Sequence, residues 1–216
     1  MCTFEKAPRV TFPARRPLYY YITDRHQLPA GSINALSSTI RQVMSWGVDF
    51  VQLREKDLAD RDLLHLTQDA VKYACGTSCK ILVNGRFDVA VAGGADGIHL
   101  PSTGLQVADL KPVLPRDFIV GVSAHSLLEA RRAAKDGADY VLLGPVFRTP
   151  SKMRYGEPLG ISRFRKICAA LSLPVFGLVG IRPEFIRRVM DAGATGIAGI
   201  SLFQGDLSQF VPEDCR

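Results

Sequence analysis

The sequence lacks several features that define large classes of protein. No apolar run approaches the roughly 20 residues that a membrane span needs, and no apolar signal-peptide segment stands at the N-terminus. The five cysteines are an odd number, which argues against a complete disulfide framework. We therefore expect a cytoplasmic protein with reduced thiols and no membrane contact.

Two ligand-binding signatures are also missing. Cys75 and Cys79 are not followed by a second Cys or His pair at zinc spacing, so we expect a loop at a helix end there. No G-x-G-x-x-G follows the first apolar run, which weakens a dinucleotide-binding interpretation.

The sequence also lacks a large excess of charge of one sign. Lys and Arg number 27 against 21 Asp and Glu, giving a net charge of +6. Residues 1–16 hold four of these cations and one Glu, so half of the excess lies there. We predict an N-terminal extension over residues 1–16 and one domain over residues 17–216. The remaining charge favours small anionic ligands over nucleic acid.

Eight β-rich apolar runs are present, and helix-period segments separate them. Most runs are continuously apolar, as strands covered on both faces are. Residues 60–73 and 126–135 are the clearest helices, and Ser126 is a candidate N-cap. Eight such units in about 200 residues predict a single small TIM (β/α)8 barrel, with a doubly wound open sheet as the alternative. The expected strands are residues 18–23, 50–54, 80–84, 97–100, 118–122, 140–144, 175–178 and 196–201.

A short motif repeats before every second predicted strand. Its Gly supplies the left-handed helix C-cap that a short loop from helix to strand needs. Alternate units of an eight-fold array explain this phasing, although any α/β fold can use such a loop. The four copies are residues 47–49 (GVD), 94–96 (GAD), 137–139 (GAD) and 193–195 (GAT).

Cations follow the second predicted strand. Alternation along the strand places Gln52, Arg54 and Lys56 on one side, toward the barrel mouth. Two converging cations repel each other unless an anion lies between them, so we interpret them as ligands of a phosphate or pyrophosphate. The alternative is that both pair with Glu55 or with another carboxylate.

Three further strand ends carry polar side chains. Asn84 has an amide suited to a heteroaromatic ring, and Ser123 ends the fifth strand. His125 follows as a candidate proton shuttle, or else as a structural histidine before the next helix. We interpret His99, which lies within a strand, as inward packing.

Two loops complete the predicted mouth. The loop after the sixth strand is rich in hydroxyls and cations, and we interpret it as a lid that includes Thr149, Ser151 and Lys152, or as a solvated loop. Backbone N–H groups after the seventh and eighth strands form the recurrent phosphate site of TIM barrels. In this chain they lie near Gly180, Ile200 and Ser201.

Taken in order, these segments resemble the thiamine-phosphate synthase/TenI family over about residues 18–203. The resemblance rests on the collinear set 21–24 (YITD), 52–56 (QLREK), 83–84 (VN), 95–100 (ADGIHL), 122–125 (VSAH), 144–147 (GPVF) and 151–152 (SK). It implies a small phosphorylated heterocyclic substrate and a possible homo-oligomer. In the synthases, the matches of Gln52, Arg54, Lys56 and Asn84 face a pyrimidine pyrophosphate, and that of Ser123 lies near the forming bond. Those of Thr149, Ser151 and Lys152 close over phosphates, and those of Gly180, Ile200 and Ser201 hold a thiazole phosphate.

The departures from the family pattern concern magnesium. The synthases use Mg²⁺ and carry an Asp after the strand-three Asn, where this chain has Gly85. A second Asp follows the His-Leu pair, where residues 101–104 read PSTG. Mg²⁺ binds carboxylate oxygen, so we expect no metal ligand and no cofactor.

The Leu-Pro-Ser segment resembles the TenI branch, whose members are metal-independent thiazole tautomerases with an acid–base His that matches His125. We therefore expect a thiazole tautomerase. The alternatives are a divergent Mg-dependent thiamine-phosphate synthase, a non-catalytic binder of thiazole or thiamine phosphate, and an unrelated phosphosugar isomerase.

Overall fold

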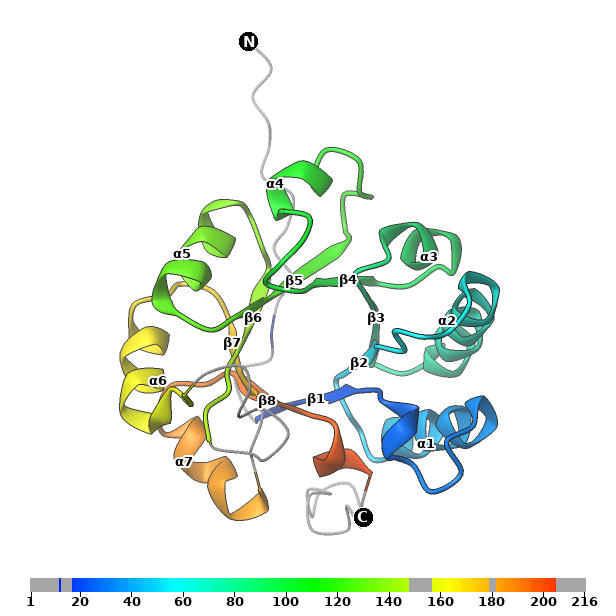
Figure 1. Ribbon diagram of the computed structural model, residues 1–216, viewed down its shortest axis with the longest axis horizontal. Helices are drawn as coiled ribbons and strands as arrows, with labels where there is room; N and C mark the ends of the chain where they lie inside the picture. The colour runs from blue at the N-terminus through cyan, green and yellow to red at the C-terminus, as the bar shows by residue number, and fades with distance from the viewer. Residues whose placement is uncertain (1–11, 13–16, 148–156, 179–181, 205–216) are drawn as a thin grey trace.

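The chain forms a closed barrel of eight parallel strands, which follow one another in sequence order, and β1 pairs with β8 (Figure 1). The computed structural model describes residues 12, 17–147, 157–178 and 182–204. The strands are β1 (Leu18–Ile22), β2 (Phe50–Leu53), β3 (Lys80–Asn84), β4 (Gly97–Leu100), β5 (Ile119–Ala124), β6 (Tyr140–Leu143), β7 (Val175–Leu178) and β8 (Gly196–Gly199).

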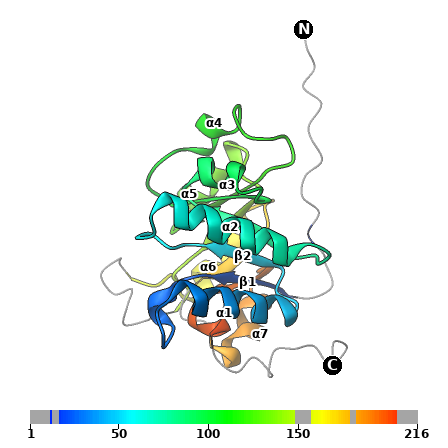
Figure 2. The same ribbon diagram turned by 90° about the vertical axis from the view of Figure 1, so that its right-hand side faces the viewer.

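Helices cover the outside of this barrel, and α1 and α2 lie side by side along it (Figure 2). They are α1 (Ile33–Ser45), α2 (Asp60–Ala74), α3 (Phe87–Ala92), α4 (Val107–Leu110), α5 (Leu127–Lys135), α6 (Gly160–Ala169) and α7 (Ile186–Met190). Three short 3-10 helices are η1 (Arg25–Gln27), η3 (Pro183–Phe185) and η4 (Ser201–Phe203).

The predicted TIM barrel is confirmed, and the open sheet is wrong because β1 hydrogen-bonds β8. Three strands match their predicted bounds, and the others differ at one or both ends. Helix α5 begins where expected, since the Ser126 hydroxyl accepts the Glu129 N–H at 3.2 Å. Cys75 follows the last residue of α2, so its segment is the expected loop at a helix end. Cys75, Cys79 and Cys168 are free thiols.

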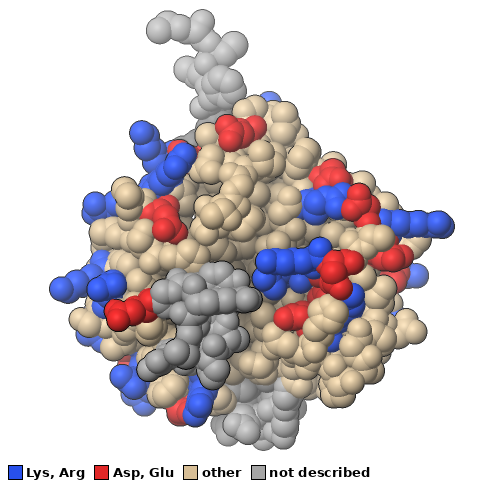
Figure 3. All heavy atoms as spheres, viewed as in Figure 1, with Lys and Arg blue, Asp and Glu red and all other residues tan. Residues whose placement is uncertain are grey.

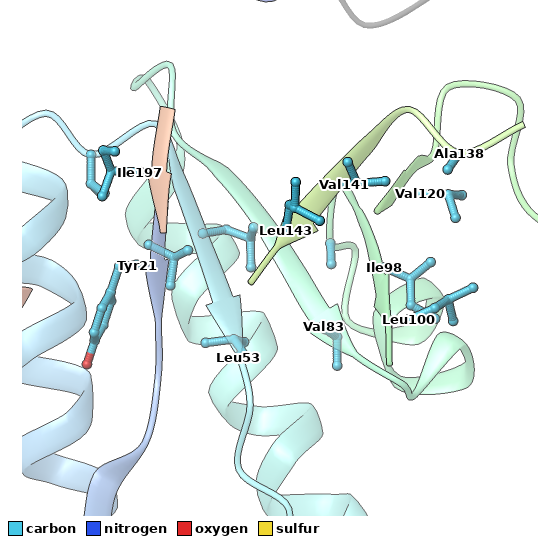
Figure 4. Packing of buried hydrophobic residues seen from close by; sticks show 14 of the residues in the cluster. Tyr21, Leu53, Val83, Ile98, Leu100, Val120, Ala138, Val141, Leu143 and Ile197 are labelled. Atoms are coloured by element: carbon cyan, nitrogen blue, oxygen red, sulfur yellow. The ribbon is translucent and has the colours of Figure 1, made fainter. Parts of the chain in front are cut away.

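Two apolar cores result from strand alternation. Outward side chains pack against the helices, and Figure 4 shows part of this layer, with Leu53, Val83 and Ile98 on neighbouring strands. The second core fills the barrel itself with aromatic rings. Tyr20 and Phe50 stack there with centroids 5.5 Å apart, and Phe176 packs edge-on to both rings. The barrel is therefore a packed core, and ligand space is confined to its ends.

The repeated Gly motif has a structural role at the amino ends of the strands. The carboxylates of Asp49, Asp96 and Asp139 each accept a backbone N–H of the preceding strand at 2.8 Å. Thr195 does the same with its hydroxyl at 3.2 Å. In each case the N–H of the motif residue bonds back to the carbonyl of the residue that it caps. These four reciprocal clamps therefore join β1 to β2, β3 to β4, β5 to β6 and β7 to β8.

The predicted N-terminal extension touches the barrel at one described residue. The ring of Phe12 stacks on Phe50 at 5.9 Å and packs edge-on to Phe176 at 6.2 Å. Phe12 therefore adds to the aromatic core inside the barrel.

The surface charge forms no one-sided stripe on the face shown in Figure 3, where basic and acidic side chains alternate around the rim. Within the described residues, no helix is long and apolar enough to span a bilayer.

Candidate functional site

The carboxyl ends of the strands carry the predicted site residues, because all eight strands point the same way. Gln52 is buried inside the barrel, and its side-chain amide donates to Asn84 Oδ1 at 2.9 Å. Asn84 ends β3 and is half-buried. The structure thus brings these two predicted residues into direct contact.

The two predicted cations after β2, Arg54 and Lys56, differ in their surroundings. Strand β2 ends at Leu53, so strand alternation no longer applies to Lys56, which lies exposed in a turn. Arg54 is half-buried, and its N–H donates to Thr23 Oγ1 at 2.8 Å. Arg54 lies close enough to His99 to contribute to lowering its pKa. The strand-alternation argument therefore does not extend to Lys56, and the phosphate-binding roles of Arg54 and Lys56 stay predictions.

Glu55 has another partner than the predicted cations. Its buried carboxylate binds the Arg25 guanidinium at 3.1 Å and accepts the Arg25 backbone N–H. Asp57 binds the other end of that guanidinium at 2.5 Å. The hydrogen bond from Arg25 holds the pKa of Asp57 well below its usual range. Arg25, which the sequence analysis missed, thus fastens the β1 end to the β2 end.

His99 is more than inward packing. Its ring is buried inside the barrel, stacked on Tyr140 at 5.8 Å. Nε2 lies 2.8 Å from Ser123 Oγ, and Nδ1 lies 3.1 Å from the Tyr140 hydroxyl. Ser123 also lines a small open hollow together with Pro101 and Ser102. His99 therefore contacts a predicted site residue from within the core.

His125 follows β5 and is exposed at the mouth. Its Nδ1 lies 2.5 Å from the carbonyl oxygen of Gly144, the residue after β6, and a carbonyl only accepts. Nδ1 therefore carries the proton, and in the neutral ring Nε2 keeps its lone pair. The His125 N–H donates to Glu129 Oε2 at 2.9 Å, which fixes the start of α5.

Other predicted site residues fall in two groups. Ile200 is half-buried and Ser201 is exposed where η4 begins, directly after β8. Thr149, Ser151, Lys152 and Gly180 lie outside the described residues. Their roles remain predictions.

The family's metal does not fit the described mouth. Gly85 follows Asn84 with a φ of 71° and has no side chain to offer. The nearby Asp88 carboxylate is bound by Arg86 at 2.7 Å, and that hydrogen bond lowers its pKa. Among the residues that the structure describes, no group of three His, Cys, Asp or Glu side chains is placed to hold a metal ion.

Two functional contacts were invisible to sequence reasoning. Strand alternation places His99 and Ser123 on the inner side, but only barrel closure determines that their side chains meet. The Arg25 contact joins residues 30 positions apart.

A closed (β/α)8 barrel whose carboxyl mouth holds His125, Ser123, Gln52 and Asn84 defines a class, the TIM-barrel enzymes of small ligands. Comparison with known proteins then identifies the family. A family model described as thiamine monophosphate synthase matches residues 19–203, and the chain belongs to this family.

Individual relatives agree with this family. A Geobacter sulfurreducens protein named "Putative thiamine-phosphate synthase" is 41% identical, covering 87% of this chain and 86% of its own. A thiamine-phosphate synthase of Methanoculleus marisnigri is 37% identical and covers 87% of both chains. The solved thiamine phosphate pyrophosphorylase of Pyrococcus furiosus superimposes with a TM-score of 0.79 at 30% identity, covering 92% and 93%. These names match the synthase alternative, and none of them supports the tautomerase interpretation.

Proposed function

We propose that the mouth of this barrel binds a phosphorylated thiazole and that His125 transfers a proton on it, a metal-independent tautomerisation. The observation that carries the proposal is the His125 ring, whose Nδ1–H is fixed on Gly144 while Nε2 faces away from that bond. An imidazole held in one tautomer is suited to take up a proton and return it elsewhere.

The proposed step conserves the formula of the ligand. Nε2 of His125 removes a proton from one ring carbon, and the resulting imidazolium returns a proton to a second position, which gives the aromatic tautomer. The carbonyl of Gly144 stabilises the charged ring during the transfer because it accepts the Nδ1–H. Ile200 and Ser201 hold the phosphate in this proposal. We also propose a cytoplasmic location.

The second candidate is the synthase reaction, which joins a pyrimidine pyrophosphate to a thiazole phosphate. The names of the relatives favour it, and the Gln52–Asn84 pair is retained. The residues at the two family metal positions oppose it, since neither Gly85 nor Gly104 offers a carboxylate.

One pair of assays separates the candidates. In the first, a thiazole carboxylate phosphate is supplied and its aromatic tautomer is followed by ultraviolet absorbance, with and without EDTA. The proposal expects turnover that EDTA leaves unchanged. In the second, pyrimidine pyrophosphate and thiazole phosphate are supplied with Mg²⁺, and thiamine phosphate is detected by chromatography. Turnover there that EDTA abolishes, with none in the first assay, would overturn the proposal and establish the synthase.

A further inference from the structure

A chain of buried polar side chains crosses the inside of the barrel from β5 to β3. Ser123 Oγ contacts His99, His99 contacts Tyr140, and Tyr140 contacts Tyr20 at 2.8 Å between hydroxyl oxygens. The Tyr20 hydroxyl then lies 3.3 Å from Gln52 Oε1. Through the Gln52 amide, the chain ends at Asn84. Both ends lie at the mouth, and the middle is fully buried.

The direction of each hydrogen bond follows from its chemistry. An amide oxygen only accepts, so Tyr20 donates its single proton to Gln52. The Tyr20 oxygen is therefore the acceptor for Tyr140, which donates its own proton. Burial raises the pKa of both phenols, so both remain protonated.

The same reasoning extends to the histidine. With its proton given to Tyr20, Tyr140 accepts from His99, which therefore carries its proton on Nδ1. Burial, with a smaller effect of Arg54, lowers the pKa of His99 to about 3, so the ring is neutral. Nε2 then has a lone pair, and the Ser123 hydroxyl donates to it.

The packing inside the barrel holds the Tyr140 ring in its place in this chain. A Cβ atom at Gly121 of β5 would overlap the Tyr140 ring, so the absent side chain makes room for that ring beside β5. His99 and Tyr20 then hold it from two sides, with centroids 5.8 and 5.7 Å from its own.

We propose that this chain fixes what the mouth offers to a ligand: the Ser123 oxygen, with its proton given to His99, presents acceptor lone pairs, and Asn84, whose Oδ1 accepts the Gln52 amide, presents its amide N–H donors. His99 is then a positioning residue, because it acts through Ser123. This inference rests on the mouth being the ligand site of the proposed function, whichever reaction follows.

The first test is spectroscopic and needs no turnover. In protein labelled with nitrogen-15 histidine, the chemical shifts of the His99 ring report which nitrogen carries the proton, and variants of the other three histidines assign its signals. We expect a neutral ring protonated at Nδ1 at pH 7. A ring protonated at Nε2, or at both nitrogens, would overturn the proposal.

A substitution at Tyr140 tests whether its hydroxyl sets the tautomer of His99. Tyr140→Phe removes the acceptor for His99 Nδ1–H, so we expect the Nε2–H tautomer to gain population. The matched control is Tyr21→Phe, which removes a buried hydroxyl on β1 that accepts from Gln204, outside the chain. Equal spectra in both variants would contradict the proposed coupling.

Failure of His125→Gln to slow tautomerisation would overturn the proposed function and leave the His99 result standing, because the tautomer of His99 is measured without turnover.

Discussion

His125 Nδ1 lies 2.5 Å from the carbonyl oxygen of Gly144, so the residue after β5 is tied to the residue after β6. The bond orients the ring across the mouth and fixes its tautomer. It also makes the proposed proton transfer testable.

His125→Gln removes the proton-transfer group and keeps a polar side chain of similar length. We expect the tautomerisation rate to fall by about 100-fold or more, the usual contribution of a positioned acid–base group. The free energy of unfolding, measured in urea, should change little. His65→Gln on the exposed side of α2 is the control and should leave the rate unchanged. Equal rates for His125→Gln and the wild type would refute the role.

The missing carboxylates predict a gain of metal binding when they are supplied. Gly85→Asp with Gly104→Asp places acids at the two family positions, and Gly85→Asn with Gly104→Asn is the uncharged control. Isothermal titration should show at least about tenfold tighter Mg²⁺ binding for the Asp pair, because Mg²⁺ favours carboxylate oxygen. Both glycines have positive φ, so each variant should lose about 1 kcal/mol of stability per site. Equal Mg²⁺ affinity of the two pairs would show that these positions do not face a common site.

The burial of His99 predicts a pH dependence of stability. Its pKa falls from 6.5 to about 3 in the folded protein, mainly through burial. Below pH 6.5 His99 binds a proton in the unfolded chain but not in the folded chain, so stability is lost as pH falls toward 3. The slope from this residue is about 1.4 kcal/mol per pH unit.

Urea unfolding between pH 6.5 and 4.5 measures this slope. His99→Gln should unfold with a shallower pH dependence than the wild type, whereas the exposed His65→Gln should keep the wild-type slope. Parallel curves for the wild type and His99→Gln would mean that His99 is protonated in the folded state.

The clamp of Asp49 predicts a stability loss remote from the mouth. Asp49→Ala leaves the Tyr19 N–H without this carboxylate and should cost about 2 kcal/mol in urea unfolding. Asp49→Asn keeps an acceptor oxygen and should cost less. Asp117→Ala, in the exposed loop before β5, serves as the control. A catalytic rate that fell together with stability would show that the clamp also shapes the mouth.

The sequence predicts the barrel well because each strand is a local, buried apolar run. Phe50–Leu53 and Gly97–Leu100 are recognisable without any knowledge of their neighbours. The site was less accessible because it depends on closure. In the sequence His99 has the pattern of a packing residue, and only the pairing of β4 with β5 brings it to Ser123. Strand alternation does not apply to Lys56, because β2 ends before it.

The four clamps have a consequence for how this molecule can change. They lie at the amino ends of the strands, and they join four of the eight strand pairs without any residue of the mouth. Because these contacts hold the strands at their amino ends, residues at the carboxyl ends can change without loss of the barrel. Carboxylates at the ends of β3 and β4 can be gained or lost in the course of evolution while the barrel keeps its shape, so related chains can share a skeleton and differ in chemistry.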